Sequence, residues 1–220
     1  MAGDALSQEY SRADVPEVVV SRLPQYLRIL NQLLEDGTLV VSSQQLGDKL
    51  QVTPAQIRKD LSYFGRFGKQ GRGYSVRDLL ERLRQILGVN SYWNVAVVGV
   101  GRLGRAILNY PGFNPDGFHL VAAFDVNPQV IGEEVGGLAV RALEELHRVT
   151  NEEKISIAIV AVPVSQTQEV VDQLVACGVR AILNYAPIAP HVREGIKIRN
   201  IDPVLSLQSM TYFINDSAEG

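Results

Sequence analysis

The pattern of apolar and polar positions changes near residue 90 of this 220-residue chain. Before that point apolar residues recur every three or four positions, as at Leu23, Leu27 and Leu30, which places them on one face of a helix. After it, short β-branched runs such as Val95 to Val98 alternate with helical patterns. Such alternation is typical of buried parallel strands joined by helices. The pattern therefore predicts a helical unit followed by an α/β unit.

Capping residues mark the helices of the first unit. A long helix is predicted from Val15 to Leu34, or from about Ser21 if Pro24 occupies its first turn. A serine-capped helix then ends at Leu50, and Thr53, followed by a proline, starts a third helix. Two short helices joined by a brief turn predict a helix-turn-helix.

The second helix of this motif has one apolar and one polar face. Ile57, Leu61 and Phe64 share the apolar face through their i, i+4, i+7 spacing. The residues left on the opposite face are polar: Gln56, Arg58, Lys59, Ser62 and Tyr63. A basic, glycine-punctuated segment from Arg66 to Tyr74 follows and is predicted to form a β-hairpin wing. Ser75 is then predicted to cap a further helix from Val76 to Leu87.

Charge is distributed unevenly along the chain. Residues 41–84 hold nine Lys or Arg against four Asp or Glu, a balance of +5, whereas residues 86–220 hold nine against fourteen, a balance of −5. A basic segment on an acidic protein favours a polyanionic partner, of which nucleic acid is the commonest. A solvated charged face, or a helical bundle that contacts protein, is the alternative interpretation.

The second unit is predicted to be a doubly wound parallel sheet of the Rossmann type. Beyond Val95 to Val98, its strands are predicted at His119 to Phe124, Leu138 to Val140, Ile155 to Val162, Val179 to Leu183 and Ile196 to Ile201. Ligands of such sheets lie outside the carboxyl ends of the strands. This rule places Val162, Pro163, Asn184 and Tyr185 around a bound ligand.

A glycine motif follows the first of these strands, in the run Gly99-Val100-Gly101-Arg102-Leu103-Gly104. A strand precedes it and a helical pattern follows, which is the context required of a dinucleotide fingerprint. The first glycine makes the tight turn, the second admits a pyrophosphate, and the third lets the helix pack against the strand.

Asp125 supports the dinucleotide interpretation. It ends the next strand and lies 21 positions after Gly104, near the interval expected for the acid that binds the adenine ribose hydroxyls. A carboxylate there favours NAD over NADP, because it would repel a 2′-phosphate. A chance aspartate after a glycine-rich turn is the alternative.

The domains are predicted at residues 1–90 for DNA binding, 91–202 for NAD(H) binding, and 203–220 for a C-terminal helix and tail. No apolar run approaches the roughly 20 residues of a membrane span, and the first residues do not resemble a signal peptide. Cys177 is the single cysteine, so it forms no internal disulfide. We expect a cytoplasmic protein with no membrane association and no bound metal.

Both halves together resemble the bacterial redox-sensing transcriptional repressor family called Rex. The resemblance runs from about Ser21 onward, and its most specific segments are Val52 to Gly65, Gly68 to Tyr74, Val98 to Gly104, Asn109 to Phe113 and Ile182 to Pro187. It implies a homodimer that represses transcription, binds operator DNA and leaves it when NADH replaces NAD+. A two-fold dimer with two DNA readers predicts a palindromic operator.

The resemblance also implies roles for individual residues. Arg58 and Lys59 would reach base edges or phosphates, with Gln56, Ser62 and Tyr63 adding contacts and Lys69 and Arg72 acting from the wing. The tail from Pro203 to Phe213 would form a helix that crosses to the partner subunit, although a helix docked on its own domain is an open alternative. Position 185 carries Tyr where many relatives have Phe, and Pro203 follows Asp202 where others have an apolar residue.

The switch requires a polar group that distinguishes the two nucleotides, since NAD+ and NADH differ by one positive charge and by the planarity of the ring. Asp202 and Tyr110 are the candidates for this group. Our hypothesis is that Asp202 pairs with Arg28 in one state and with Tyr110 in the other, which would couple the nucleotide to the DNA readers.

Two other functions compete with this one. An NAD-dependent oxidoreductase would need a proton-transfer group near the nicotinamide, and His191 is the only histidine placed where it could approach. A CoA-binding module on a similar fold is the second alternative. With a helix-turn-helix ahead of the sheet and no clear catalytic group behind it, the protein is predicted to sense NADH and not to be an enzyme.

Overall fold

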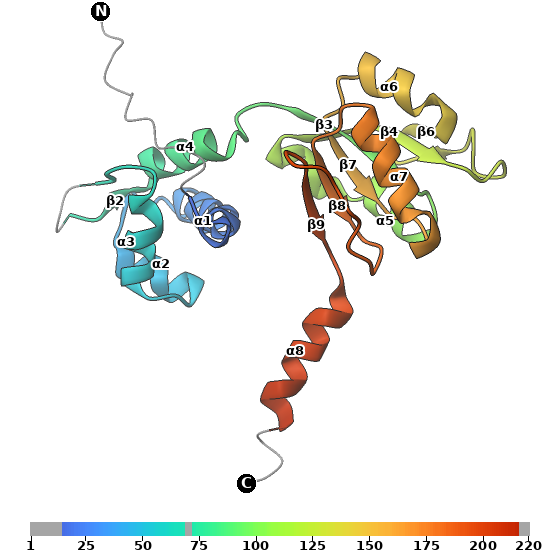
Figure 1. The fold of residues 1–220 in the computed structure, drawn as a ribbon. Coiled ribbons are helices and arrows are strands. Elements are labelled where there is room, and N and C mark those ends of the chain that lie inside the picture. The colour runs from blue at the N-terminus through green and yellow to red at the C-terminus, as the bar shows by residue number, and fades with distance from the viewer. Residues whose placement is uncertain (1–14, 69–71, 216–220) are drawn as a thin grey trace, which may run out of the picture. The chain divides into compact units, whose positions relative to one another are not determined.

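The computed structural model describes residues 15–68 and 72–215. Its contacts divide the chain into two compact units, Met1–Asn90 and Ser91–Gly220. Each unit has its own hydrophobic core, and each is described here by itself (Figure 1).

Unit 1 is a small helical domain with a two-stranded sheet. Its elements are α1 (Glu17–Glu35), β1 (Val40–Val41), α2 (Ser43–Leu50), α3 (Pro54–Ser62), β2 (Tyr74–Ser75) and α4 (Val76–Leu87). The predicted caps are confirmed: Ser42 caps α2 through a capping box with Gln45, Thr53 caps α3, and Ser75 caps α4. The structure therefore contains the predicted helix-turn-helix, with α3 as its second helix.

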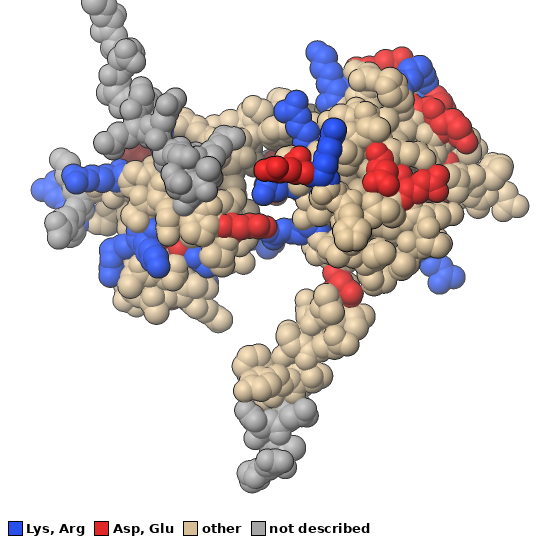
Figure 2. Space-filling model, in the orientation of Figure 1, with Lys and Arg blue, Asp and Glu red and all other residues tan. Residues whose placement is uncertain are grey.

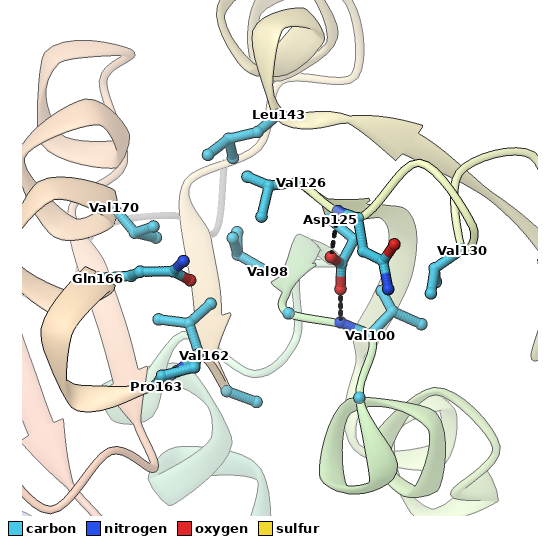
Figure 3. Close-up of a pocket in the computed structure, with 14 residues that line it drawn as sticks. Val98, Val100, Asp125, Val126, Val130, Leu143, Val162, Pro163, Gln166 and Val170 are labelled. Atoms are coloured by element: carbon cyan, nitrogen blue, oxygen red, sulfur yellow. Dashed lines mark hydrogen bonds between the residues drawn. The ribbon is translucent and has the colours of Figure 1, made fainter.

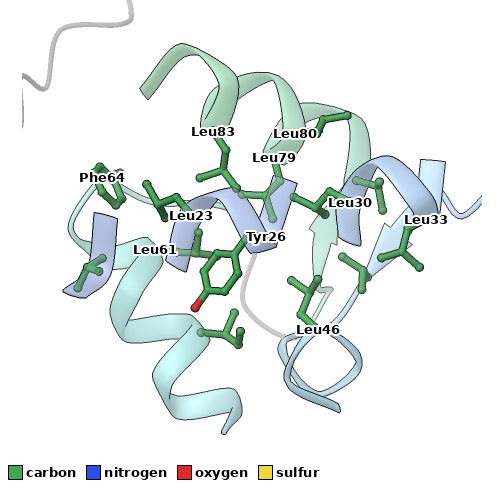
Figure 4. Packing of buried hydrophobic residues seen from close by; sticks show 14 residues of the cluster. Leu23, Tyr26, Leu30, Leu33, Leu46, Leu61, Phe64, Leu79, Leu80 and Leu83 are labelled. Atoms are coloured by element: carbon green, nitrogen blue, oxygen red, sulfur yellow. The ribbon is translucent and has the colours of Figure 1, made fainter. Parts of the chain in front are cut away.

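The core of unit 1 lies between α1, α3 and α4 (Figure 4). Leu23, Tyr26 and Leu30 project from α1 into this core, and α3 adds Ile57 and Leu61. All five side chains are almost fully buried, so the inner face of α3 is held against α1 and its polar face is left outside.

The structure decides between the two starts that the sequence allowed for the first helix. The helix begins at Glu17, close to the predicted Val15, so Pro24 lies in the interior of α1 and not in its first turn. Pro24 has no N–H, so it donates no hydrogen bond to the Val20 carbonyl. The wing differs from the sequence prediction, because β2 pairs antiparallel with β1, a strand that was not predicted. Residues 69–71, which include Lys69, lie outside the described residues.

Unit 2 is built on one sheet with the strand order β5-β6-β4-β3-β7-β8-β9. The strands are β3 (Trp93–Val98), β4 (Phe118–Asp125), β5 (Glu134–Val135), β6 (Leu138–Ala142), β7 (Ile157–Val160), β8 (Ala181–Asn184) and β9 (Lys197–Asn200). Every pairing is parallel except that of β5 with β6. This order is the doubly wound Rossmann arrangement, and it confirms the predicted fold class.

Helices cover both faces of the sheet. The helical segments are α5 (Arg102–Leu108), η2 (Pro111–Asp116), η3 (Leu143–Glu145), α6 (Leu146–Glu152), α7 (Val164–Ala176) and α8 (Pro203–Asn215). Side chains of β3 alternate between the two faces, with Ala96 and Val98 packing under α6 and α7 and with Val95 and Val97 packing under α5. The chain reverses its direction across the sheet between β3 and β7, and at such a switch point a crevice opens at the carboxyl ends.

Helix α8 is the exception to this packing. All its residues from Pro203 to Ile214 are exposed, and Phe213 keeps 73% of its surface. The alternative in which this helix docks on its own domain is therefore not what the structure shows. Among the described residues, no helix is long and apolar enough to cross a membrane.

Candidate nucleotide-binding and DNA-binding sites

The glycine motif forms the turn between β3 and α5. Gly99 has a φ of +94°, a conformation that side-chain-bearing residues rarely adopt. Its N–H donates to the Phe124 carbonyl at 2.8 Å, and a Cβ here would lie 2.5 Å from the Ala161 carbonyl oxygen. The turn is thus held between β4 and β7, and glycine is required at its first position.

The other two glycines have different surroundings. A Cβ on Gly104 would overlap the carbonyl oxygen of Gly99, so the close approach of α5 to the turn depends on this glycine. A Cβ on Gly101 would meet nothing within 4 Å. Gly101 thus borders open space, as expected where a ligand comes against the backbone.

Asp125 stands at the end of β4 and faces this turn (Figure 3). One carboxylate oxygen accepts the Val100 N–H at 2.7 Å, and the other accepts the Asn127 N–H at 2.8 Å. Because each carboxylate oxygen can accept more than one hydrogen bond, both retain capacity for hydroxyl groups of a ligand. The structure therefore holds an oriented carboxylate beside the glycine turn.

A pocket of about 260 Å³ opens at the carboxyl ends of these strands (Figure 3). Six of the predicted nucleotide-binding residues line it: Gly99, Val100, Gly101, Asp125, Val162 and Pro163. Sequence reasoning missed the other eight lining residues, which are Val98, Val126, Asn127, Val130, Leu143, Ala161, Gln166 and Val170. Apolar side chains dominate the lining, and Asp125 with Gln166 and Asn127 supplies polar groups. Such a pocket suits a flat apolar ring attached to a polar sugar.

Other predicted residues lie outside this pocket. Arg102 and Leu103 occupy the exposed first turn of α5. Asn184 is fully buried, and its amide binds the backbone of Ala186, the Ile188 carbonyl and the side chain of Asn200. Its amide thus ties down the loop that begins with the half-buried Tyr185, and direct contact between Asn184 and nucleotide stays a prediction.

The three predicted switch residues occupy separate places. Tyr110 is 60% exposed and lies edge-on to Phe113, with ring centroids 5.6 Å apart. Asp202 precedes α8 and accepts the Val204 N–H at 2.9 Å, so it caps this helix. Arg28 is an exposed residue of α1 in unit 1. Their pairing stays a prediction.

The outer face of α3 presents the predicted DNA-binding groups. Arg58, Lys59 and Ser62 are exposed, and Gln56 and Tyr63 are half-buried. The Arg58 guanidinium donates to the Ser43 hydroxyl of α2 at 3.0 Å, which links the two helices of the motif. Figure 2 shows Lys and Arg side chains gathered on this part of unit 1. Arg72, beyond the gap in the wing, is also exposed.

Sequence reasoning missed Asp60, on the inner face of α3. Its carboxylate is fully buried and accepts hydrogen bonds from Arg22 and Tyr26 of α1 and from Gln56. Burial alone would raise the pKa of Asp60, but these hydrogen bonds outweigh it and hold the pKa below its ordinary value. Burial and the same carboxylate raise the pKa of the Tyr26 hydroxyl. Asp60 is therefore ionised and Tyr26 neutral at physiological pH.

Each of the two units matches a known protein family. Residues 14–62 match a family described as "Putative DNA-binding protein N-terminus", and residues 90–188 match one described as "CoA binding domain". The redox-sensing transcriptional repressor Rex of Roseiflexus sp. (strain RS-1) is 53% identical over 199 residues, which are 90% of each chain. This chain belongs to the Rex family.

Solved Rex structures resemble the chain over both units. The repressor RSP in complex with β-NAD+ and operator DNA has a TM-score of 0.88 and 37% identity, and the match covers 93% of this chain and 94% of that one. The same repressor in complex with β-NADH has a TM-score of 0.84 and 35% identity, with coverage of 93% and 96%. The expected family and fold class are thus confirmed.

Proposed function

We propose that this Rex-family chain is a transcriptional repressor that binds operator DNA with NAD+ or without nucleotide and releases it on binding NADH. The observation that supports this most is the presence, in one chain, of a glycine turn with an oriented carboxylate and of a helix-turn-helix with a basic face. The relatives named above are redox-sensing repressors, and one was solved with both NAD+ and operator DNA.

The pocket residues suit separate parts of the dinucleotide. Asp125 would accept hydrogen bonds from the ribose hydroxyls, and the open backbone at Gly101 would receive the pyrophosphate. Val126, Leu143 and Val162 would enclose the adenine. Outside the pocket, Arg102 and Leu103 in the exposed first turn of α5 would border the pyrophosphate, and Tyr185 would lie toward the nicotinamide. When bound, NAD+ would bring a positive charge on its nicotinamide ring, which NADH lacks.

The switch would act through Asp202. It lies between β9 and α8, so a change in its partner would be transmitted to the helix that it caps. Pairing with Arg28 in one nucleotide state and with Tyr110 in the other would change the orientation of the DNA readers. A coupling of about 1–3 kcal/mol corresponds to a change of about 5- to 150-fold in DNA affinity.

The protein would act as a homodimer on a palindromic site. Apolar side chains of α8, among them Leu205, Leu207 and Phe213, are exposed along its length, and a helix with such a surface needs a partner. The partner subunit would bury this helix between its two domains, as the resemblance implied. A DNA-binding repressor of this kind acts in the cytoplasm of a bacterium.

A CoA-binding protein is the second candidate, because the "CoA binding domain" family matches residues 90–188. The adenosine of CoA carries a 3′-phosphate, which the Asp125 carboxylate would repel, whereas NADH presents a free ribose diol. We favour a sensor over an oxidoreductase because a helix-turn-helix precedes the sheet in the same chain, and because the similar proteins named above are repressors.

One experiment separates these functions. Full-length protein is titrated with NADH, NADPH and CoA by calorimetry, and a palindrome-selected DNA pool is then used in mobility shifts with NAD+ and with NADH. We expect NADH to bind most tightly and to release the DNA. DNA binding that is the same with NAD+ and with NADH would contradict the sensor function. Tighter binding of CoA than of NADH would favour the second candidate.

A further inference from the structure

Asp60 receives four hydrogen bonds in the interior of unit 1. Arg22 donates from Nε and from Nη2, each at 2.7 Å, and the Tyr26 hydroxyl donates at 2.6 Å. The fourth donor is Nε2 of Gln56, one turn earlier on α3, at 2.6 Å. The carboxylate thus joins the inner face of α3 to α1 and also holds a side chain that reaches the outer surface.

The charge of Asp60 decides which way the Gln56 amide turns. An ionised carboxylate accepts hydrogen bonds and donates none, so only the NH₂ group of Gln56 can face it. The reverse orientation would bring the amide oxygen against a carboxylate oxygen, which repels it. Gln56 is therefore held with its Oε1 and its second N–H directed away from Asp60.

This orientation matters because of where Gln56 lies. It is half-buried in the first turn of α3, and the N-terminal residues of such a helix contact base edges in the major groove. An amide distinguishes bases by which of its groups, donor or acceptor, meets the base edge. A freely turning amide would tolerate both arrangements.

We propose that Asp60 is a positioning residue that fixes which edge of Gln56 faces operator DNA and so sets sequence discrimination at one base pair. This role rests on the proposed repressor function. Asp60 itself touches no DNA, because its carboxylate is buried. Asp60→Asn would keep the size of the side chain, but its amide could pair with Gln56 in either sense, so Gln56 could present either group.

The test measures discrimination by full-length protein. Affinities are determined for the selected operator and for operators with single base-pair changes, using wild type, Asp60→Asn, Gln56→Ala and the double variant. We expect Asp60→Asn and Gln56→Ala to lose discrimination at the same base pair, by about tenfold, with the double variant no worse than Gln56→Ala. Uniform weakening on every DNA, or unchanged discrimination, would overturn the proposal.

The chain contains a matched control on the preceding helix. Gln44 and Asp48 of α2 form the same i, i+4 amide–carboxylate pair, at 2.8 Å, but on an exposed surface. Asp48→Asn should leave discrimination unchanged at every position. A loss equal to that of Asp60→Asn would show that any such pair gives the effect, which contradicts a specific role for Asp60.

A second measurement covers the case in which Asp60→Asn does not fold. Side-chain ¹⁵N relaxation in the wild-type protein reports how ordered the Gln56 amide is. The signal of this amide is assigned as the one that is missing from the spectrum of Gln56→Ala. We expect an amide about as ordered as the backbone, and an amide with an order parameter below about 0.6 would overturn the proposal. If the wild-type protein did not bind operator DNA, this result would instead refute the repressor function.

Discussion

Replacing Asp125 with asparagine removes the negative charge beside the glycine turn and keeps the size of the side chain. In the wild-type protein, the two carboxylate oxygens accept hydrogen bonds from the N–H groups of Val100 and Asn127, one on each oxygen. Asparagine has a single acceptor oxygen, so one of these N–H groups would face an NH₂ group instead. We therefore expect both a looser turn and a weaker hold on the ribose.

The magnitude follows from the hydrogen bonds that are lost. A hydrogen bond to a charged group contributes about 1.5–3 kcal/mol, so losing one to the ribose diol should weaken NADH binding by about 10- to 150-fold. NADPH should be affected less, because the variant no longer repels its 2′-phosphate. The preference for NADH over NADPH should therefore decrease.

The assay is calorimetric titration of wild type and Asp125→Asn with NADH and with NADPH, followed by mobility shifts on operator DNA. Operator binding without nucleotide should be kept, since Asp125 lies in unit 2, but release should need correspondingly more NADH. Asp116→Asn serves as control, because Asp116 is an exposed carboxylate of the same unit and does not line the pocket. An unchanged ratio of NADH to NADPH affinity in Asp125→Asn would refute this reasoning.

Three further predictions concern other parts of the chain. Gly104→Ala should lower the free energy of unfolding by about 1–3 kcal/mol in urea titrations and should also weaken NADH binding, because its Cβ would overlap the Gly99 carbonyl oxygen. Gly101→Ala should weaken NADH binding without lowering the free energy of unfolding, because its Cβ would point into open space. The lowered pKa of Asp60 contributes stability that is present above pH 4 and lost in more acidic solution, and the raised pKa of Tyr26 contributes stability that is lost well above pH 10. Urea unfolding against pH should thus be flat near neutrality and fall in acid, with a smaller acid slope in Asp60→Asn. Phe213→Asp should shift sedimentation toward monomer, whereas an unchanged dimer would exclude α8 from the interface.

Local signals were sufficient for most of the elements. The caps at Ser42, Thr53 and Ser75 and the apolar spacing placed α2, α3 and α4, because a cap acts on N–H groups only two or three residues away. The glycine turn was equally readable, since the requirement for φ > 0 at Gly99 is a property of its own backbone. Asp125 could be found because its distance along the chain from the turn is characteristic.

Features that depend on distant residues could not be read in this way. Strand β1 exists only through its pairing with β2, which lies more than thirty residues later, and two valines alone carry no strand signal. The sequence left open whether Pro24 lies inside the first helix or in its first turn, because the residues that extend α1 back to Glu17, such as the buried Val19, pack against the rest of unit 1. Asn184 reads as a polar residue at a strand end, but its burial and its bonds to Asn200 are decided by the neighbouring strand.

The sequence by itself determined that this protein has a helix-turn-helix followed by a Rossmann sheet with a dinucleotide turn, because periodicity, caps and glycine spacing act over a few residues. Only the tertiary structure decided which polar groups meet. Asp60 looked like one more charge on a polar helix, and its contacts with Arg22 and Tyr26 join residues more than thirty positions apart. Burial makes such a carboxylate depend on its partners, and burial is a property of the whole fold.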